Sequence, residues 1–401
     1  MSTREAQTEI GREAHADDAA RSPASDRTAA ELAGVLSAFN QVVLDHIPGL
    51  ELFDAHTHLG QNDPDGMRQR PEELLSGLTL AHARGAFVFP MHEPDGYCNA
   101  NDMVLAAARD SGGALVPFAR VDPHQRPVPE AERCLDAGAR GIKLHPRAEQ
   151  FTLDHPAVRD LVALAHERRV PVLIHAGRGI PALGVHAVEL AGAFPEARLI
   201  LAHAGICDLS WIWEAAPDHP NLLFDTAWWM PTDLITLFSL VPAGQVVFAS
   251  DSPYGSTLMS SSFQLRLALQ AGLSGDQIRS VASGQALRLA AGEALLPAGP
   301  PLGEREQAPH VLLERLAQFV LLAVIELFRG GDGAEMLALA RLACDIPSDI
   351  DDAPVFAAVL GLLDLHARLS AANPDDRRVR ALLILAASVA RSPDVPLPPV
   401  Q

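Results

Sequence analysis

The chain has 401 residues, enough for one large domain of about 250 residues and a smaller one. Hydrophobic residues make up 48% of the chain and charged residues 20%, which excludes a wholly disordered or fibrous protein. Acidic residues outnumber basic ones 50 to 31, and the formal charge of −19 argues against nucleic acid or membrane as a main partner. Four scattered cysteines without a CxxC pair exclude a disulfide scaffold and a thiolate zinc site.

The first residues, 1–28, are polar and show no periodicity, so we expect a disordered tail and no secretory signal. Residues 29–46 carry apolar residues at helical spacing and predict a helix. The longest apolar stretch, near Leu316–Phe328, is interrupted by Glu326 and is too short to cross a bilayer. The expected location is therefore the cytoplasm.

From residue 50, short apolar runs alternate with helical stretches. Strands are predicted at 50–56, 86–90, 114–121, 141–145, 170–175, 198–203, 221–226 and 245–250. Helices are predicted between most of them, for example at Pro71–Arg84, Ala100–Asp110, Pro156–Arg168 and Pro231–Leu240. This alternation predicts an α/β fold, a closed (β/α)8 TIM barrel, with a doubly wound open sheet as the alternative.

The pattern changes again after the predicted barrel. Residues 257–293 indicate closing helices, and the Pro- and Gly-rich segment 295–309 indicates a linker. Four amphipathic helices are then predicted, at about 309–329, 333–345, 353–371 and 375–391. The expected organisation is a barrel with its N-terminal helix over 29–294 and an additional C-terminal all-α helical domain over 310–401.

Ionisable residues end five of the eight predicted strands, and the carboxyl ends of barrel strands build active sites. His56 and His58 lie two residues apart on an extended segment, so both rings point to the same side. The other strand-terminal residues are Lys143, His145, His175, His203 and Asp251. Nitrogen and oxygen ligands without thiolate suit zinc, manganese or iron(II). The pattern therefore predicts a divalent metal site.

The sequence resembles the amidohydrolase superfamily over about residues 50–293, within its branch of small metal-dependent barrel hydrolases and decarboxylases. The motifs that carry the resemblance are FDAHTHLG (53–60), GIKLHP (141–146), LIHAG (173–177), LAHAG (201–205) and FASDSPYG (248–255). The resemblance implies one or two metals, most commonly zinc, bound by His56, His58, His175 and Asp251. It gives His203 one of two roles, a ligand of a second metal or an acid or base.

Lys143 is the only lysine among 31 basic residues. Arginine does not form a neutral amine at working pH, whereas a buried lysine can lose its charge. The resemblance implies a carboxylated Lys143 that bridges two metals. The alternatives are a clamp for a substrate carboxylate and a structural ion pair. A single lysine, taken without its position, is normally a solvated surface charge.

The six rarest aromatic residues all follow predicted strands, which favours an aromatic-lined pocket over simple loop packing. They are Tyr97, Trp211, Trp213, Trp228, Trp229 and Tyr254. Candidate substrate-binding residues are His145, Arg178, Trp228, Tyr254 and His92, with Glu93 beside the last. Arg178 lies in a GxGxxA-like stretch, but the rest of a dinucleotide-binding pattern is missing. No GxSxG elbow is present, which argues against a serine hydrolase.

Three functional hypotheses follow. The first is a hydrolase in which Asp251 takes a proton from a metal-activated water, while His203 or Lys143 stabilises the oxyanion of an amide, ester or lactone. The second is a metal-dependent decarboxylase or hydratase acting on an aromatic or unsaturated carboxylate. The third is a scaffold whose C-terminal helices mediate interaction. The expected partners are a small-molecule substrate and a second copy of the chain in a homodimer, with no nucleic acid or membrane.

Overall fold

Eight parallel strands form the centre of the molecule. The computed structural model describes residues 23–64, 66–303 and 310–399. The strands are β1 Leu52–Leu59, β2 Ala83–Pro90, β3 Leu115–Arg120, β4 Gly141–Leu144, β5 Pro171–Ile174, β6 Arg198–Leu201, β7 Leu222–Asp225 and β8 Val246–Val247. They pair in sequence order. The segment after β8 closes the ring on β1, because Ala55 donates a backbone hydrogen bond to Phe248 at 2.8 Å and Thr57 bridges Ser252. The predicted barrel is confirmed over the open sheet.

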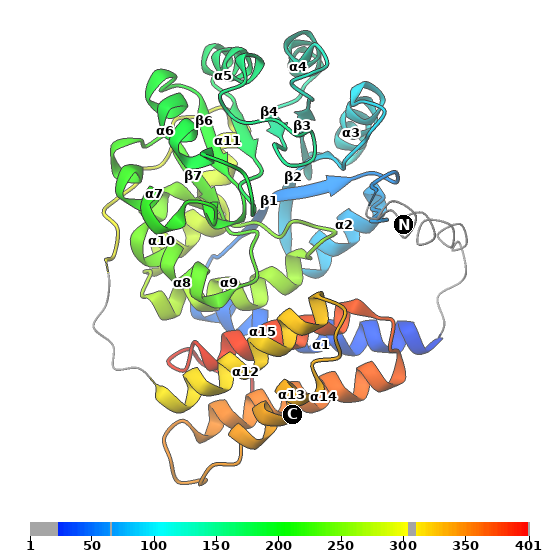
Figure 1. The fold of residues 1–401 in the computed structure, drawn as a ribbon, viewed down its shortest axis with the longest axis vertical. Coiled ribbons are helices and arrows are strands. Elements are labelled where there is room, and N and C mark those ends of the chain that lie inside the picture. Colours follow the sequence, from blue (N-terminus) through cyan, green and yellow to red (C-terminus); the bar gives the residue numbers. More distant parts are fainter. Residues whose placement is uncertain (1–22, 65, 304–309, 400–401) are drawn as a thin grey trace, which may run out of the picture.

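The barrel helices surround the strands (Figure 1). They are α2 Pro71–Leu80, α3 Cys98–Asp110, α4 Pro127–Asp136, α5 Pro156–Arg168, α6 Leu183–Ala193, α7 Leu209–Ala215, α8 Pro231–Leu240, α9 Thr257–Ala271, α10 Gly275–Arg279 and α11 Gln285–Ala291. Proline stands in the first turn of α2, α4, α5 and α8, where its missing N–H costs nothing. The helix predicted at Pro71–Arg84 ends at Leu80, because β2 already begins at Ala83.

Apolar side chains fill the interior of the barrel below the strand ends. The buried cluster includes Phe53, Phe87, Phe118, Leu173 and Leu223. The Phe87 and Phe118 rings lie 4.6 Å apart between centroids, and Phe53 meets Phe87 edge-on at 5.1 Å. A packed interior leaves the carboxyl ends of the strands as the place where polar side chains gather.

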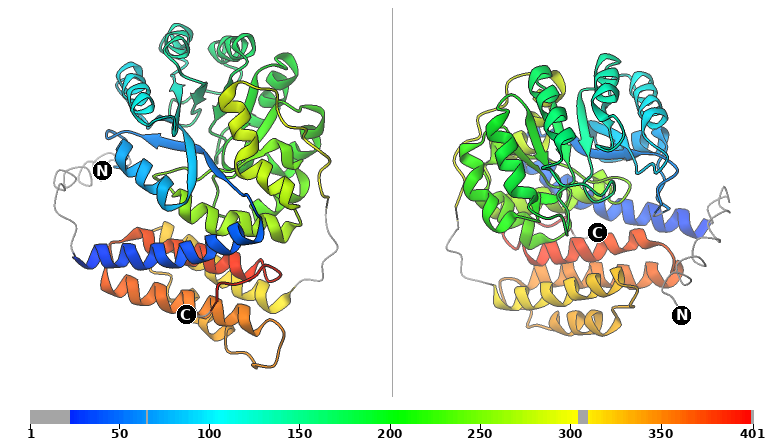
Figure 2. Two further views of the ribbon diagram at one scale, coloured as in Figure 1. Left: turned by 180° about the vertical axis from the view of Figure 1, so that it is seen from behind. Right: turned by 45° about the horizontal axis from the view of Figure 1, so that its top comes forward.

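A layer of helices lies along one side of the barrel (Figures 1 and 2). It consists of α1 Pro23–His46, α12 Val311–Phe328, α13 Ala334–Ala343, α14 Ala353–Ala372 and α15 Ala381–Ala390. We call these five helices the helical layer. The expected C-terminal helices are therefore present. Buried residues of the helical layer and of the barrel helices belong to one continuous apolar cluster, which is distinct from the cluster inside the barrel, so the layer packs against the outside of the barrel.

The N-terminal helix differs from the sequence prediction, whereas the described part of the predicted linker, residues 295–303, contains no helix or strand. Helix α1 begins at Pro23, earlier than the predicted start at residue 29, because its apolar positions Leu32, Leu36 and Phe39 are buried and order the whole helix. Residues 1–22 of the expected tail lie outside the described residues. Residues 304–309 of the predicted linker also lie outside the described residues. Its described part bonds to the barrel, since Gly244 donates to the Ala298 carbonyl at 3.0 Å and Gly303 donates to the Ser239 carbonyl at 2.9 Å.

One helix in the described part of the chain, α14, is long and apolar enough to cross a membrane by length and composition alone. A core helix of this length passes the same test. In this structure α14 buries Phe356, Val359, Leu362 and Leu363 within the helical layer.

Candidate active site

Two histidines and one aspartate converge at the carboxyl end of the barrel. His56 and His58 lie on β1, and Asp251 follows β8. The Nε2 atom of each histidine lies 3.1 Å from the same oxygen, Oδ1 of Asp251. Their three ligand atoms lie within 4.8 Å of one another, and no other trio of histidine, cysteine, aspartate or glutamate in the described ranges meets this geometry. We call these three residues the ligand cluster.

The hydrogen bonds behind the two imidazoles decide what their Nε2 atoms can do. His56 Nδ1 lies 2.7 Å from Oδ2 of Asp225, which accepts only, so Nδ1 carries the proton. His58 Nδ1 faces the carbonyl oxygen of Pro90 at 3.4 Å, which imposes the same tautomer. Both Nε2 atoms therefore face the same oxygen of the Asp251 carboxylate. Two ring nitrogens and a carboxylate oxygen that converge in this way form a donor set that fits a divalent metal ion of the zinc type.

The backbone at this end of the barrel is strained. Asp251, His203 and Ala204 have positive φ angles of 61°, 58° and 58°, a conformation that non-glycine residues rarely adopt. Asp54 ties the strained loop to β1, since its Oδ1 accepts from the Ser250 backbone at 3.0 Å and its Oδ2 accepts from Thr257 at 2.6 Å. Such strain persists where the surrounding structure fixes a functional geometry.

Lys143 points into the barrel from β4 and is completely buried. Its Nζ lies 3.3 Å from Nε2 of His56 and 4.7 Å from the centre of the Phe89 ring. Burial, with the neighbouring Arg120 guanidinium, lowers the pKa of Lys143 to about 7. Within the described residues it forms no ion pair, so the alternative of a structural ion pair finds no support.

The two other expected histidine ligands bond to each other beside the ligand cluster. His203 Nδ1 lies 2.7 Å from the Ala227 carbonyl, to which it donates, and its Nε2 lies 2.8 Å from Nδ1 of His175. This leaves Nε2 of His175 buried and without a partner. His145 stacks on His175 with 3.8 Å between ring centres. Burial lowers the pKa of all three rings, so they are neutral at physiological pH.

Two adjoining cavities open at the ligand cluster. The polar cavity, of about 380 Å³, is lined by His56, His58, Asp63, His92, Arg120, Lys143, His145, Arg147, Ala148, His175, Asp251 and Tyr254. The apolar cavity, of about 370 Å³, is bordered by aromatic and aliphatic side chains, among them Trp228, Trp229, Met259, Phe263, Phe328 and Ile384. Arg147, His175, Asp251 and Tyr254 line both cavities, so the two adjoin at these residues.

The structure brings together the expected substrate-binding residues. His92 and His145 line the polar cavity, Arg178 and Trp228 line the apolar one, and Tyr254 borders both. Tyr254 also donates a hydrogen bond to Asp63 at 2.9 Å. Two of the other rare aromatic residues lie in different places. Trp229 lines the apolar cavity, whereas Trp211 lies on the surface and donates a hydrogen bond to Asp208 at 3.1 Å. Glu93 accepts a hydrogen bond from Asn62 at 3.0 Å and is not among the residues that line either cavity.

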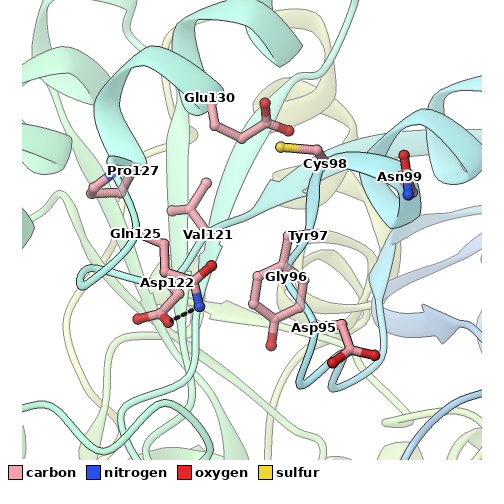
Figure 3. A pocket seen from close by; sticks show the side chains of 10 residues that line it. All are labelled: Asp95, Gly96, Tyr97, Cys98, Asn99, Val121, Asp122, Gln125, Pro127 and Glu130. Carbon is pink, nitrogen blue, oxygen red and sulfur yellow. Dashed lines mark hydrogen bonds between the residues drawn. The ribbon is translucent and has the colours of Figure 1, made fainter.

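Tyr97 borders a different, smaller hollow of about 160 Å³ between the start of α3 and the loop after β3 (Figure 3). Its hydroxyl donates to Glu149, whose carboxylate pairs with Arg120 at 2.7 Å. Arg120 is 1% exposed and lines the polar cavity, so this buried network fixes the position of one residue of the cavity wall.

Sequence reasoning missed Asp225, Arg120 and Glu149. Asp225 and Arg120 are the last residues of β7 and β3, so the same strand-end criterion that selected the histidines would have found both. Glu149 lies in a loop, and only the fold places it beside Arg120.

A sequence model of the amidohydrolase family matches residues 53–289, more than half of the chain. The chain belongs to the amidohydrolase family. Its match covers the ligand cluster, Lys143, His175 and His203, and it ends before the C-terminal helices. Proteins of this family are metal-dependent enzymes, and their reactions differ in class. No curated protein matches this amidohydrolase.

Solved structures similar to this amidohydrolase include three enzymes with different reactions. They are 2,6-dihydroxybenzoate decarboxylase from Rhizobium (15% identity, TM-score 0.48, covering 61% of this chain and 98% of that one), 4-oxalomesaconate hydratase from Rhodopseudomonas palustris (16%, 0.45, 60% and 96%) and a probable 2-pyrone-4,6-dicarboxylic acid hydrolase from Acinetobacter baumannii (14%, 0.44, 60% and 100%).

Proposed function

We propose that this amidohydrolase-family protein is a metal-dependent hydrolase that cleaves an amide, ester or lactone bond of a small molecule. The observation that carries the proposal is the ligand cluster. Two imidazole Nε2 atoms, each oriented by a hydrogen bond behind the ring, lie 3.1 Å from one oxygen of Asp251. This donor set of two nitrogens and a carboxylate oxygen suits zinc, with manganese or iron(II) as alternatives.

The proposed metal ligands are His56, His58 and Asp251, completed by His175 and, where two metals bind, by His203 and a carboxylated Lys143. A divalent metal bound there lowers the pKa of water toward neutrality and polarises a carbonyl group. The unpartnered Nε2 atom of His175 supports its place in this set, because an orphaned buried acceptor is costly unless something binds it.

Asp251 is the proposed proton acceptor. Burial alone would raise the pKa of its carboxyl, but the adjacent His56 and His58 outweigh burial and hold that pKa well below its usual range. Asp251 is therefore ionised and able to take a proton from the attacking water and pass it to the leaving group. Lys143, where it is not a ligand, stabilises the oxyanion that develops on the carbonyl oxygen, and His203 does so only when its Nε2 leaves His175 and takes up a proton.

Replacing Asp251 by Asn tests this proposal. The zinc-loaded variant should lose at least a hundredfold of kcat/KM on the most reactive member of a panel of small esters, lactones and amides, while its circular dichroism and melting temperature stay close to those of the parent. Near-full activity of the variant would contradict the assignment. Elemental analysis of protein purified with bicarbonate present counts the metals, and a value near two supports the bridging role of Lys143.

A one-metal decarboxylase or hydratase acting on an aromatic or unsaturated carboxylate is the second candidate. The composition of the ligand cluster favours it, because the cluster found among the described residues contains neither His203 nor Lys143, and side chains that bind no metal are available for acid–base work. Release of CO2 without addition of water distinguishes a decarboxylase from the hydrolase, and addition of water to a double bond identifies a hydratase.

Two further expectations belong to this proposal. We propose that the protein acts in the cytoplasm and as a homodimer, without nucleic acid or membrane as a partner. Light scattering coupled to size exclusion measures the mass of the assembly directly, and a monomer at micromolar concentration would contradict the dimer.

A further inference from the structure

The walls of the apolar cavity come from two separate parts of the chain. Trp228 and Trp229 follow β7, and Met259 and Phe263 lie on the barrel helix α9. Phe328 and Ile384 come from α12 and α15, which belong to the helical layer. The helical layer therefore does more than cover the barrel, since it supplies one wall of a cavity that reaches the ligand cluster.

Phe328 is the most unusual of these wall residues. It is the last residue of α12, and 51% of its surface is exposed although it lines the cavity. Its ring meets that of Trp229 edge-on, with 5.2 Å between centres and an angle of 73°. The Arg380 guanidinium also lies 5.7 Å from the centre of the Phe328 ring. Phe328 is thus held in place by the barrel and by the helical layer together.

The apolar cavity adjoins the ligand cluster. Asp251, His175 and Tyr254 border both cavities. A carbonyl group beside Asp251 therefore has one substituent that extends toward Trp229 and Phe328. The cavity of about 370 Å³ is large enough for such a substituent.

We propose that Phe328 is a specificity-determining residue and that the substrate carries, next to its reacting carbonyl or carboxyl group, an aromatic or aliphatic substituent that packs on Phe328 and Trp229. This inference rests on the proposed function for the position of the reacting group. Binding of the apolar substituent needs no turnover, so it is testable separately.

The probe is a series of straight-chain carboxylates from acetate to octanoate, with binding followed by isothermal titration calorimetry. In the parent protein, affinity should rise with chain length, by about fourfold for each methylene that becomes buried. Phe328→Ala should leave the affinity for butanoate within twofold and lower that for octanoate at least tenfold. Phe328→Leu should restore most of the loss, because it replaces much of the apolar surface.

Leu322→Ala is the matched control. Leu322 lies on the same helix, is 38% exposed, and is not among the residues that line the cavity, so its variant should bind the whole series like the parent. Equal octanoate affinity of Phe328→Ala and the parent would overturn the proposal, as would an affinity that does not rise with chain length. Failure of the Asp251→Asn test would instead leave this chain-length dependence intact, so the two proposals fail separately.

Discussion

At the scale of single residues, Asp225 determines which nitrogen of His56 is available for a metal ion. It lies at the end of β7, is completely buried, and accepts the Nδ1 proton of His56 at 2.7 Å. Its other oxygen accepts from the backbone N–H groups of His203 and Ala227 at 2.8 and 3.0 Å. One carboxylate thus orients the ligand cluster and the His203 loop together.

Replacing Asp225 by Asn should weaken metal binding about 10- to 100-fold, the usual effect of removing a carboxylate that orients a histidine ligand. An amide can turn its NH2 group toward Nδ1 and so favour the wrong tautomer. Zinc affinity measured by competition with a chromophoric chelator checks this. Asp136→Asn, at an exposed carboxylate paired with Arg168, is the control and should bind zinc like the parent. Unchanged zinc affinity of Asp225→Asn would show that Asp225 does not orient the site.

The strand-end criterion explains what the sequence could and could not reveal about these residues. His56, His58 and Asp251 were predictable because parallel strands bring their carboxyl ends to one edge. The hydrogen bond between His203 and His175 was not predictable, because it depends on the ring rotations of two residues from different strands. The Phe328 wall was also hidden, since residue 328 lies far along the chain from residue 229 and only the packing of the helical layer joins them.

At the scale of elements, α14 contains a buried titratable group outside the active site. His366 is 7% exposed, and its Nε2 lies 3.5 Å from the Ser370 hydroxyl. Burial, followed by the charges of Arg341 on α13 and Arg380 beside α15, lowers its pKa to about 4. The ring therefore remains neutral in the folded protein at pH values where the unfolded chain, with a pKa of 6.5, already binds a proton.

This difference makes the helical layer sensitive to acid. Between pH 6.5 and 4 the unfolded chain binds more protons at this site, so the free energy of unfolding falls as the pH falls. The contribution of His366 should be about 1–2 kcal/mol between pH 7 and 5. His366→Gln removes that term while the active-site histidines stay. Denaturant unfolding at pH 7, 6 and 5 should therefore give the variant the shallower pH dependence, and parallel profiles would contradict the assignment.

The elements themselves were largely predictable, for different reasons. Helices α5 and α8 have the predicted limits because Pro156 and Pro231 mark their first turns. The extra turns of α1 were not evident in the sequence, since Pro23–Thr28 has little apolar periodicity and gains its order from the packing of the rest of the helix.

At the scale of the whole molecule, one arginine joins three regions. Arg266 on α9 is fully buried; its Nε donates to the Ser392 hydroxyl at 2.7 Å, and its other nitrogens donate to backbone carbonyls of Ser392, Val395 and Pro396. Its guanidinium also lies 6.0 Å from the ring of Phe39 on α1. The barrel, the N-terminal helix and the C-terminal segment therefore meet at this side chain.

Arg266→Met should lower the free energy of unfolding by about 2–4 kcal/mol, because several buried carbonyl groups lose their donor. Denaturant titration measures the change, and hydrogen exchange should show earlier exchange in residues 392–396. Gln270→Ala is the control: Gln270 bonds Asp394 at 2.8 Å on the exposed side of the same contact, and its loss should cost about 1 kcal/mol or less. Equal stability of the two variants would contradict a central role for Arg266.

The burial of Lys143 has a practical consequence for the study of this protein. Because every other basic side chain is arginine, the surface offers no lysine to acylating or cross-linking reagents. Any side-chain amine that reacts must first become accessible at the bottom of the polar cavity. The rate at which Lys143 is acylated therefore reports how readily a reagent reaches the bottom of the polar cavity. Mass spectrometry on a single peptide measures this rate, and any molecule that occupies the site should lower it.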